Sequence, residues 1–174
     1  LKLITAAIAF ESNLINENDV FDVSKPLKIS SRIISDFHPL DYAINIPEVI
    51  VHSSNIGSAK IAEKFGSSTQ LKYLRSLGLL NMLSLEIPEL GKPQVIRDKK
   101  VLSTMTISYG HGISITPMHL ASATATIVNS GVKVNPTLIR GKVEKKNEVI
   151  ISKETSIKMK SIMRLVVSNK NGTA

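Results

Sequence analysis

The sequence predicts an α+β fold that is mainly helical. Apolar residues recur at helical spacing in several separate segments, of which the first is LKLITAAIAF at positions 1–10. Short segments in which apolar and polar residues alternate lie between them and predict strands and loops. The chain has 174 residues, 43% of them hydrophobic, which is the size and composition of one globular domain.

The first quarter of the chain predicts one buried helix followed by extended pieces. Ile4, Ile8 and Phe10 suit a buried helix, and the polar residues at 12–19 supply a turn. Residues 16–45 contain prolines and short alternating segments. We therefore expect strands and loops there rather than a long helix.

Helical patterns dominate the next part of the chain. We expect three helices there, at residues 46–53, 55–65 and 70–80. A polar residue at 67–69 suits the N-cap of the third helix, and Gly78 suits its end.

The second half predicts a long loop, a helix, a strand pair and a last helix. Pro88, Gly91 and Pro93 break helical structure within residues 82–100, where we expect a loop with one short extended piece. Pro117 suits the first turn of a helix that ends near Gly131. The later elements are two strands within residues 133–154, joined around Lys146 and Asn147 in a β-hairpin, and a helix over residues 157–166.

The charge pattern does not favour nucleic-acid binding. The net charge of +8 comes from 22 basic and 14 acidic residues, but the basic residues are scattered along the chain. Only four Phe and three Tyr are available for base stacking. The chain has no Cys, which excludes disulfides, thiolate nucleophiles and Cys-based zinc sites and leaves the cellular compartment open.

The histidines and glycines do not form a recognisable metal or nucleotide motif. His38, His52, His111 and His119 have no paired spacing that predicts a metal site, so we expect no metal. The segment YGHG at 109–112 lacks the third glycine of a dinucleotide-binding loop. Its two glycines still permit a close approach of the backbone to another group, as in the wall of a cleft.

The segment VHSSNIGSAKIA, at positions 51–62, has two interpretations. Short polar side chains before an apolar helical pattern are typical of a helix cap. The same residues also suit an active site. Ser-x-Asn triplets are frequent by chance, so the rest of the chain has to decide between the two.

Several stretches taken together resemble the transpeptidase domain of class B penicillin-binding proteins. VHSSNIGSAKIA, SYGHGISITPMHLASATATIVNSG and VNPTLI follow one another as they do in that family and look most like its septal members. The opening KLITAAIAFESNLINENDVF resembles the helix after the family's nucleophile, in which Ser-x-x-Lys precedes an apolar helix. The resemblance runs along nearly the whole chain and implies the helical lobe of the α+β fold that this family shares with serine β-lactamases.

The resemblance also implies a mechanism and a set of site residues. In the family, a serine activated by a lysine attacks a peptide ending in D-Ala-D-Ala, and an amine from a neighbouring strand then takes the acyl group. Carried over, Lys2 is the base, Ser53 relays a proton to the departing amine, and Asn55 holds Lys2 and the substrate amide. Ser54 is then left to cap the next helix. Tyr109 and His111 resemble positions that line the substrate cleft.

Two parts of the family's machinery are expected outside these residues. The resemblance places the nucleophilic serine two positions before Leu1 and the Lys-Thr-Gly strand beyond Ala174, so that residues 1–174 are a partial transpeptidase domain. The ending KNGTA imitates Lys-Thr-Gly, but it follows directly on the last predicted helix in a turn context. We therefore expect the isolated chain to be inactive.

Other functions remain open from the sequence. The enzyme alternatives are an elongation-class transpeptidase and a β-lactamase-like serine hydrolase, and the non-enzyme alternative is a helical binding or structural module. By resemblance, the partners of the parent protein are peptidoglycan stem peptides, β-lactams and membrane proteins of the division complex, with no cofactor. Its expected place is the periplasmic face of the inner membrane, held by a transmembrane helix outside this chain.

Overall fold

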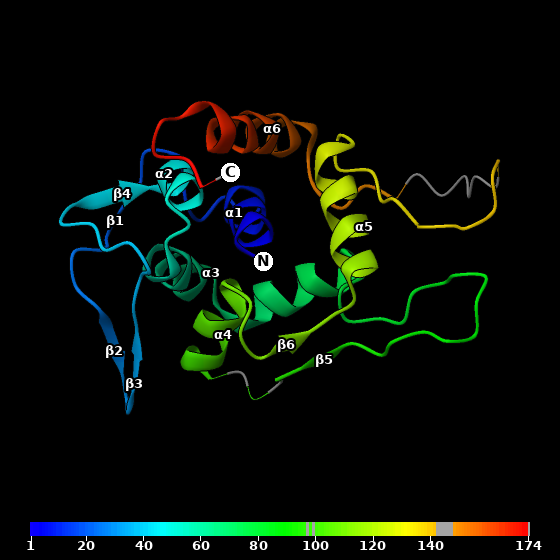
Figure 1. The fold of residues 1–174 in the computed structure, drawn as a ribbon, viewed down its shortest axis with the longest axis horizontal. Coiled ribbons are helices and arrows are strands. Elements are labelled where there is room, and N and C mark those ends of the chain that lie inside the picture. Colours follow the sequence, from blue (N-terminus) through cyan, green and yellow to red (C-terminus); the bar gives the residue numbers. More distant parts are fainter. Residues whose placement is uncertain (97, 99, 142–147, 174) are drawn as a thin grey trace.

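The computed structural model describes residues 1–96, 98, 100–141 and 148–173. It is helix-rich, with three small two-stranded sheets at its periphery (Figure 1). The helices are α1 (Lys2–Glu11), α2 (Ile46–Val51), α3 (Asn55–Ser76), α4 (Val101–Ser108), α5 (Pro117–Val128) and α6 (Lys153–Ser168). The strands are β1 (Val20–Asp22), β2 (Leu27–Ile29), β3 (Arg32–Ile34), β4 (Ala43–Asn45), β5 (Gln94–Val95) and β6 (Ile113–Ser114).

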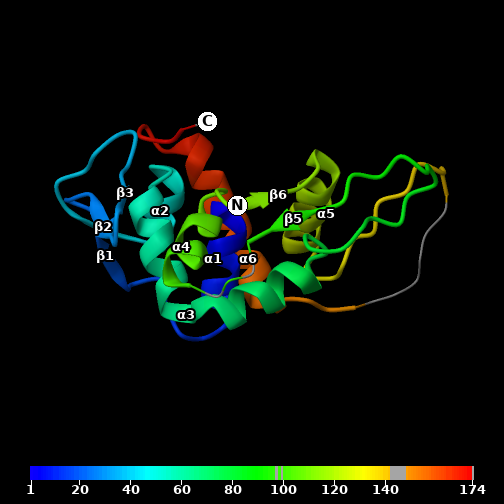
Figure 2. The same ribbon diagram turned by 90° about the horizontal axis from the view of Figure 1, so that it is seen from below.

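Helix α1 is the centre of the molecule. It contacts α2, α3, α4, α5 and α6, which surround it in both ribbon views (Figures 1 and 2). Every residue from Ile4 to Phe10 is buried. Apart from Thr5 this segment is apolar, and a helix without a polar face needs such all-round cover.

The carboxyl end of α1 is joined to the amino end of α6 by one carboxylate. Glu11 Oε2 accepts hydrogen bonds from the Ser152 backbone N–H at 2.8 Å, the Ser152 hydroxyl at 2.9 Å and the Thr155 hydroxyl at 2.7 Å. A carboxylate at this position also interacts favourably with the dipole of α6. The contact ties together two helices that both contribute residues to the cavity described below.

All three sheets are antiparallel pairs. Strand β1 pairs with β4, and β5 pairs with β6. Strands β2 and β3 form a hairpin with two residues in its turn, and this hairpin projects away from the helices (Figure 1). The segments predicted to be extended within residues 16–45 are therefore confirmed as strands.

The predicted strand pair within residues 133–154 is reduced to one bridge. Val132 and Val149 form an isolated antiparallel bridge, and no regular strand flanks it in the described residues. Pro136 cannot donate a ladder hydrogen bond, which disfavours a longer strand on that side. The predicted turn at Lys146 and Asn147 lies outside the described residues.

The helical predictions are confirmed at α1, α2, α3, α5 and α6. The predicted helices 55–65 and 70–80 are the two arms of α3, which loses helical geometry between them at Gly66, where φ is 73°. Helix α4 and strand β6 were not predicted. Within the described ranges, no helix combines the length and the apolar character needed to cross a bilayer.

Candidate active site

The turn between α2 and α3 places Ser53 in an unusual backbone conformation. Its φ is +54°, in the left-handed region that favours glycine. The Ser54 N–H donates to the Val49 carbonyl at 3.0 Å, and the Ser53 N–H donates to the Ile50 carbonyl at 3.2 Å. These two bonds form a Schellman motif at the end of α2, in which the position of Ser53 is usually taken by glycine.

Ser54 begins the next helix. Its backbone is extended, and its hydroxyl oxygen accepts a hydrogen bond from the Gly57 N–H at 2.8 Å. This side chain satisfies one of the N–H groups that the first turn of a helix leaves unpaired. The prediction that Ser54 is a helix cap is confirmed, and Ser53 is left to face the other way.

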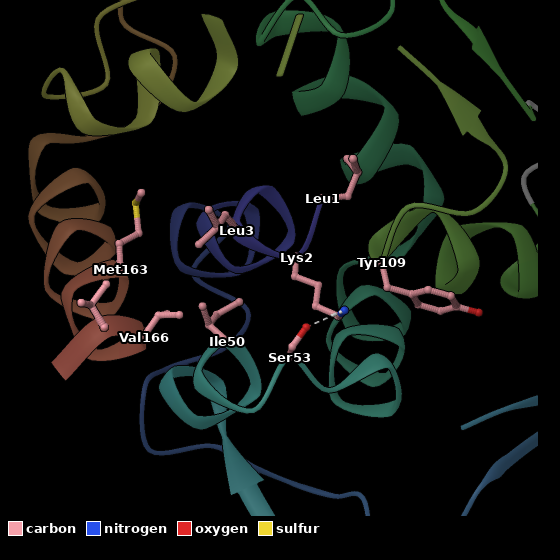
Figure 3. A pocket seen from close by; sticks show the side chains of 9 residues that line it. Leu1, Lys2, Leu3, Ile50, Ser53, Tyr109, Met163 and Val166 are labelled. Carbon is pink, nitrogen blue, oxygen red and sulfur yellow. Dashed lines mark hydrogen bonds between the residues drawn. The ribbon is translucent and has the colours of Figure 1, made fainter. Parts of the chain in front are cut away.

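Lys2 and Ser53 meet although 51 positions separate them in the sequence. The Lys2 Nζ donates a hydrogen bond to the Ser53 hydroxyl oxygen at 3.0 Å. Figure 3 shows Lys2 extending from the start of α1 and Ser53 from the turn before α3, with the two side chains directed at each other. Burial lowers the pKa of the Lys2 ammonium group, and the negative charge of Asp36 opposes that shift. A lysine with a lowered pKa is better suited to act as a base.

An apolar cavity adjoins this pair. It has a volume of about 380 Å³. Lys2 and Ser53 supply polar groups to it, Tyr109 also lines it with its hydroxyl directed away from the pair, and the remaining wall is apolar (Figure 3). That wall consists of Leu1, Leu3, Ile50, Met163, Val166 and Val167. The cavity combines a few convergent polar groups with an apolar surface, as ligand sites usually do.

Tyr109 and His111 are placed differently with respect to the cavity. Tyr109 lines it at the end of α4, and partial burial raises the pKa of its phenol. The Thr5 hydroxyl donates to the Ser108 carbonyl at 2.9 Å, which ties the residue before Tyr109 to the helix that carries Lys2. His111 is exposed and contacts the Tyr109 ring with the centroids 5.1 Å apart. It is not among the described residues that line the cavity.

The side chain of Asn55 is directed at a neighbouring loop. Its Nδ2 donates to the Ser35 carbonyl at 3.0 Å. The structure therefore brings Asn55 next to Ser53 in the turn without a described bond to Lys2. The predicted role of Asn55 toward Lys2 and the substrate stays a prediction.

The comparison with protein families agrees with this arrangement. All residues, 1–174, match the model described as the penicillin binding protein transpeptidase domain. The chain belongs to the penicillin-binding protein transpeptidase family.

Curated members of the family resemble this chain along most of its length. It is 33% identical to a probable peptidoglycan D,D-transpeptidase FtsI of Caulobacter vibrioides, over 99% of this chain and 30% of that protein. It is 27% identical to a peptidoglycan D,D-transpeptidase FtsI homolog of Mesostigma viride, over 90% of this chain and 28% of that protein. The chain thus spans less than a third of the length of these two relatives.

Solved structures show the same fold. The apo transpeptidase domain of Burkholderia pseudomallei penicillin-binding protein 3 superposes with a TM-score of 0.91 at 21% identity. The superposition covers 99% of this chain and 53% of that one. A peptidoglycan glycosyltransferase from Burkholderia ambifaria gives the same TM-score and identity, with 55% of its chain covered. The helix-rich α+β architecture is therefore that of penicillin-binding transpeptidase domains.

His119 makes hydrogen bonds inside the fold and does not line the cavity. His119 is buried, its Nδ1 lies 2.7 Å from the Thr116 hydroxyl, and its Nε2 lies 2.9 Å from the Asn81 carbonyl. The Thr116 N–H donates to Nδ1, so Nε2 carries the proton and donates to Asn81. Among the residues that the structure describes, no group of three or more His, Cys, Asp or Glu side chains is placed to hold a metal ion.

Sequence reasoning missed one residue that contacts the Ser53–Asn55 turn. Asp36 lies in the loop after β3, and its carboxylate bonds Ser54, Asn55 and Ile56. Nothing in the sequence pattern links Asp36 to a triplet that begins 17 residues later. Its acidic character in a loop is the only local signal, and Asp41 in the same loop shares it, so it does not identify the partner.

Proposed function

We propose that this chain is part of a peptidoglycan D,D-transpeptidase that cross-links cell-wall peptides at the division septum and is acylated by β-lactams. The observation that carries the proposal is the hydrogen bond between Lys2 and Ser53 beside an apolar cavity, in a chain that matches the transpeptidase family throughout. The names of the FtsI relatives support the septal assignment.

In the proposed mechanism, Lys2 acts on a serine that the family places three residues before it. A serine hydroxyl is a weak nucleophile at neutral pH, and a base one helical turn away lies on the same helix face. Neutral Lys2 takes the hydroxyl proton as the serine oxygen bonds to the carbonyl carbon of the D-Ala-D-Ala peptide. Burial of Lys2 favours its neutral form and so supports this role.

In this proposal, the Ser53 hydroxyl delivers a proton to the leaving group. The bond from the carbonyl carbon to the terminal D-alanine nitrogen breaks, and the proton now on Lys2 passes through the Ser53 hydroxyl to that nitrogen. The 3.0 Å contact supports such a relay, because proton transfer needs hydrogen-bond distance. The amine of a second peptide then attacks the ester carbonyl, the bond to the serine oxygen breaks, and the proton lost by the amine returns through Lys2 to that oxygen. Asn55 holds the substrate amide, and Tyr109 and His111 line its path.

The partners and location follow from the same proposal. The substrates are peptidoglycan stem peptides, and the partners of the whole protein are membrane proteins of the division complex. The whole protein lies on the periplasmic face of the inner membrane, anchored by a helix outside residues 1–174. A fluorescent fusion of the full-length protein is expected to collect at the division site, whereas an elongation-class enzyme would follow the side wall.

The test of the activity is covalent labelling of the full-length protein with a fluorescent penicillin. We expect stable labelling of the unmodified protein and release of D-alanine from a peptide ending in D-Ala-D-Ala. Lys2→Met should slow labelling by at least about a hundredfold, since general-base catalysis contributes that much. Lys160→Met, which removes an exposed lysine on α6, is the matched control and should label normally.

Three outcomes would contradict the proposal. An unlabelled full-length protein would exclude a penicillin-acylated enzyme and favour a binding or structural module. Rapid loss of the label would indicate a β-lactamase-like hydrolase. Labelling of Lys2→Met at the normal rate would remove Lys2 from the mechanism.

A further inference from the structure

We propose that Asp36 is a positioning residue of this site: its carboxylate holds the turn from Ser53 to Asn55 in register with Lys2. The inference rests on the proposed transpeptidase function, and it adds a residue from a separate loop to the machinery. Asp36 belongs to the loop between β3 and β4 and is half-buried against the start of α3.

Both carboxylate oxygens of Asp36 are engaged by the turn. Oδ2 accepts a hydrogen bond from the Ser54 hydroxyl at 2.6 Å. Oδ1 accepts from the backbone N–H of Asn55 and from that of Ile56, the latter at 2.9 Å. The preceding carbonyl, of Ser35, accepts the Asn55 side chain at 3.0 Å. Residues 35 and 36 thus bind three consecutive residues that directly follow Ser53.

These bonds bear on Ser53 because its backbone conformation is unfavourable. A non-glycine residue in the left-handed region persists only where its surroundings hold it there. On one side, the Schellman bonds fix the end of α2. On the other side, Asp36 fixes the start of α3 through Ser54, Asn55 and Ile56. Loss of the carboxylate would leave only one of the two supports.

Asp36 also acts on Lys2 through its charge. Its negative charge favours the protonated form of the Lys2 ammonium group, against the effect of burial. Lys2 shares its cavity with Tyr109, the other titratable residue that lines it. Removing the Asp36 charge without moving the turn should therefore lower the pKa of Lys2 further.

Two substitutions separate the geometric and the electrostatic effects. Asp36→Asn can keep the turn, because Oδ1 accepts the two backbone N–H groups while Nδ2 donates to the Ser54 oxygen. Asp36→Ala removes all three bonds. Asp41→Asn and Asp41→Ala are matched controls, since Asp41 is an exposed carboxylate of the same loop.

The experiment measures penicillin acylation rates of these full-length variants across pH, together with a crystal structure of Asp36→Ala. We expect Asp36→Ala to acylate between about ten- and a hundredfold more slowly at a temperature where it is folded, since small displacements of catalytic groups have such effects. Its structure should lack the Lys2–Ser53 hydrogen bond. Asp36→Asn should recover most of the rate, with the acid limb of its pH profile at lower pH. The Asp41 variants should match the unmodified protein.

The inference is overturned if Asp36→Ala acylates at the unmodified rate with the Lys2–Ser53 contact intact. It is also overturned if the pH profile of Asp36→Asn coincides with that of the unmodified protein. If Asp36→Ala does not fold, the pH profile of Asp36→Asn decides. If even the unmodified protein is not acylated, the proposed function fails, and the Lys2–Ser53 geometry in the crystal structure of an Asp36 variant still decides the role of Asp36.

Discussion

Ser53 combines a proposed chemical role with a backbone conformation that disfavours a serine. A non-glycine residue in the left-handed region costs about 1–3 kcal/mol. Glycine would adopt the same φ of +54° at little cost. The hydroxyl that accepts the Lys2 hydrogen bond is therefore retained at the expense of stability.

At Ser53 we predict that one substitution increases stability and decreases activity. Ser53→Gly should raise the free energy of unfolding by about 1 kcal/mol, because the strain is relieved. It should also strongly reduce penicillin labelling, because the proton relay is lost. Thermal unfolding and labelling of the full-length protein measure the two effects.

Ser53→Ala is the matched control. It removes the same hydroxyl and keeps the backbone strain, so it should lose labelling without gaining stability. A Ser53→Gly variant that unfolds at lower temperature than Ser53→Ala would contradict the role given to strain.

At the scale of elements, α2 and α3 pack closely on either side of the Ser53 turn. A Cβ atom added at Gly57 would lie 2.4 Å from Val49 Cγ2 and 3.2 Å from the Ser54 oxygen. Gly57 is thus the point where the backbone of α3 approaches α2. The separation of the two helices depends on the absence of a side chain at this position.

We predict that Gly57→Ala destabilises the protein although alanine is the better helix former. Overpacking costs about 1–3 kcal/mol, which exceeds the gain of up to about 1 kcal/mol from helix propensity. Val49→Ala in the same chain opens the space, so the double variant should be more stable than the sum of the two single effects predicts. Thermal unfolding of the three variants measures the coupling, and strict additivity would contradict the close packing.

Elements with strong periodicity were predictable, and elements held by tertiary contacts were not. Helix α1 could be predicted, because its apolar residues recur at helical spacing. Helix α4 was missed because its sequence, VLSTMTIS, is rich in β-branched residues and serine, which have low helix propensity. Buried side chains hold it instead: Gln70 donates to the Thr104 carbonyl, and Thr5 donates to the Ser108 carbonyl.

The same distinction applies to the site. The capping role of Ser54 could be predicted from local chemistry. The pairing of Lys2 with Ser53 was expected only through the family resemblance, because no local rule connects positions so far apart. Asp36 could not be predicted, since its bonds to the turn depend on how the loop after β3 folds back on α3.

At the scale of the whole molecule, the chain spans less than a third of the length of the two FtsI relatives. The family model matches residues 1–174, but the chain covers 30% of the Caulobacter protein and 28% of the Mesostigma protein. In the proposed mechanism, the nucleophilic serine and the Lys-Thr-Gly strand come from outside residues 1–174. In that mechanism, Lys2 and Ser53 act on a serine nucleophile that is not among residues 1–174.

We therefore predict that the isolated 174-residue chain is not labelled by a fluorescent penicillin. A protein extended at both ends to include Ser-x-x-Lys and Lys-Thr-Gly should be labelled under the same conditions. Mass spectrometry of tryptic peptides identifies the acylated residue. A stable penicilloyl group on Ser53, or on any other residue of the isolated chain, would contradict this prediction.

In the proposed β-lactam-acylated enzyme, the central position of α1 has a consequence for drug resistance. Lys2 stands at the first turn of a helix that contacts all the other described helices. A substitution that changes the packing of any one of them can shift this helix and displace the ammonium group by a fraction of an ångström. Susceptibility to a covalent inhibitor can therefore drift through changes in the interior, at positions that no bound drug touches.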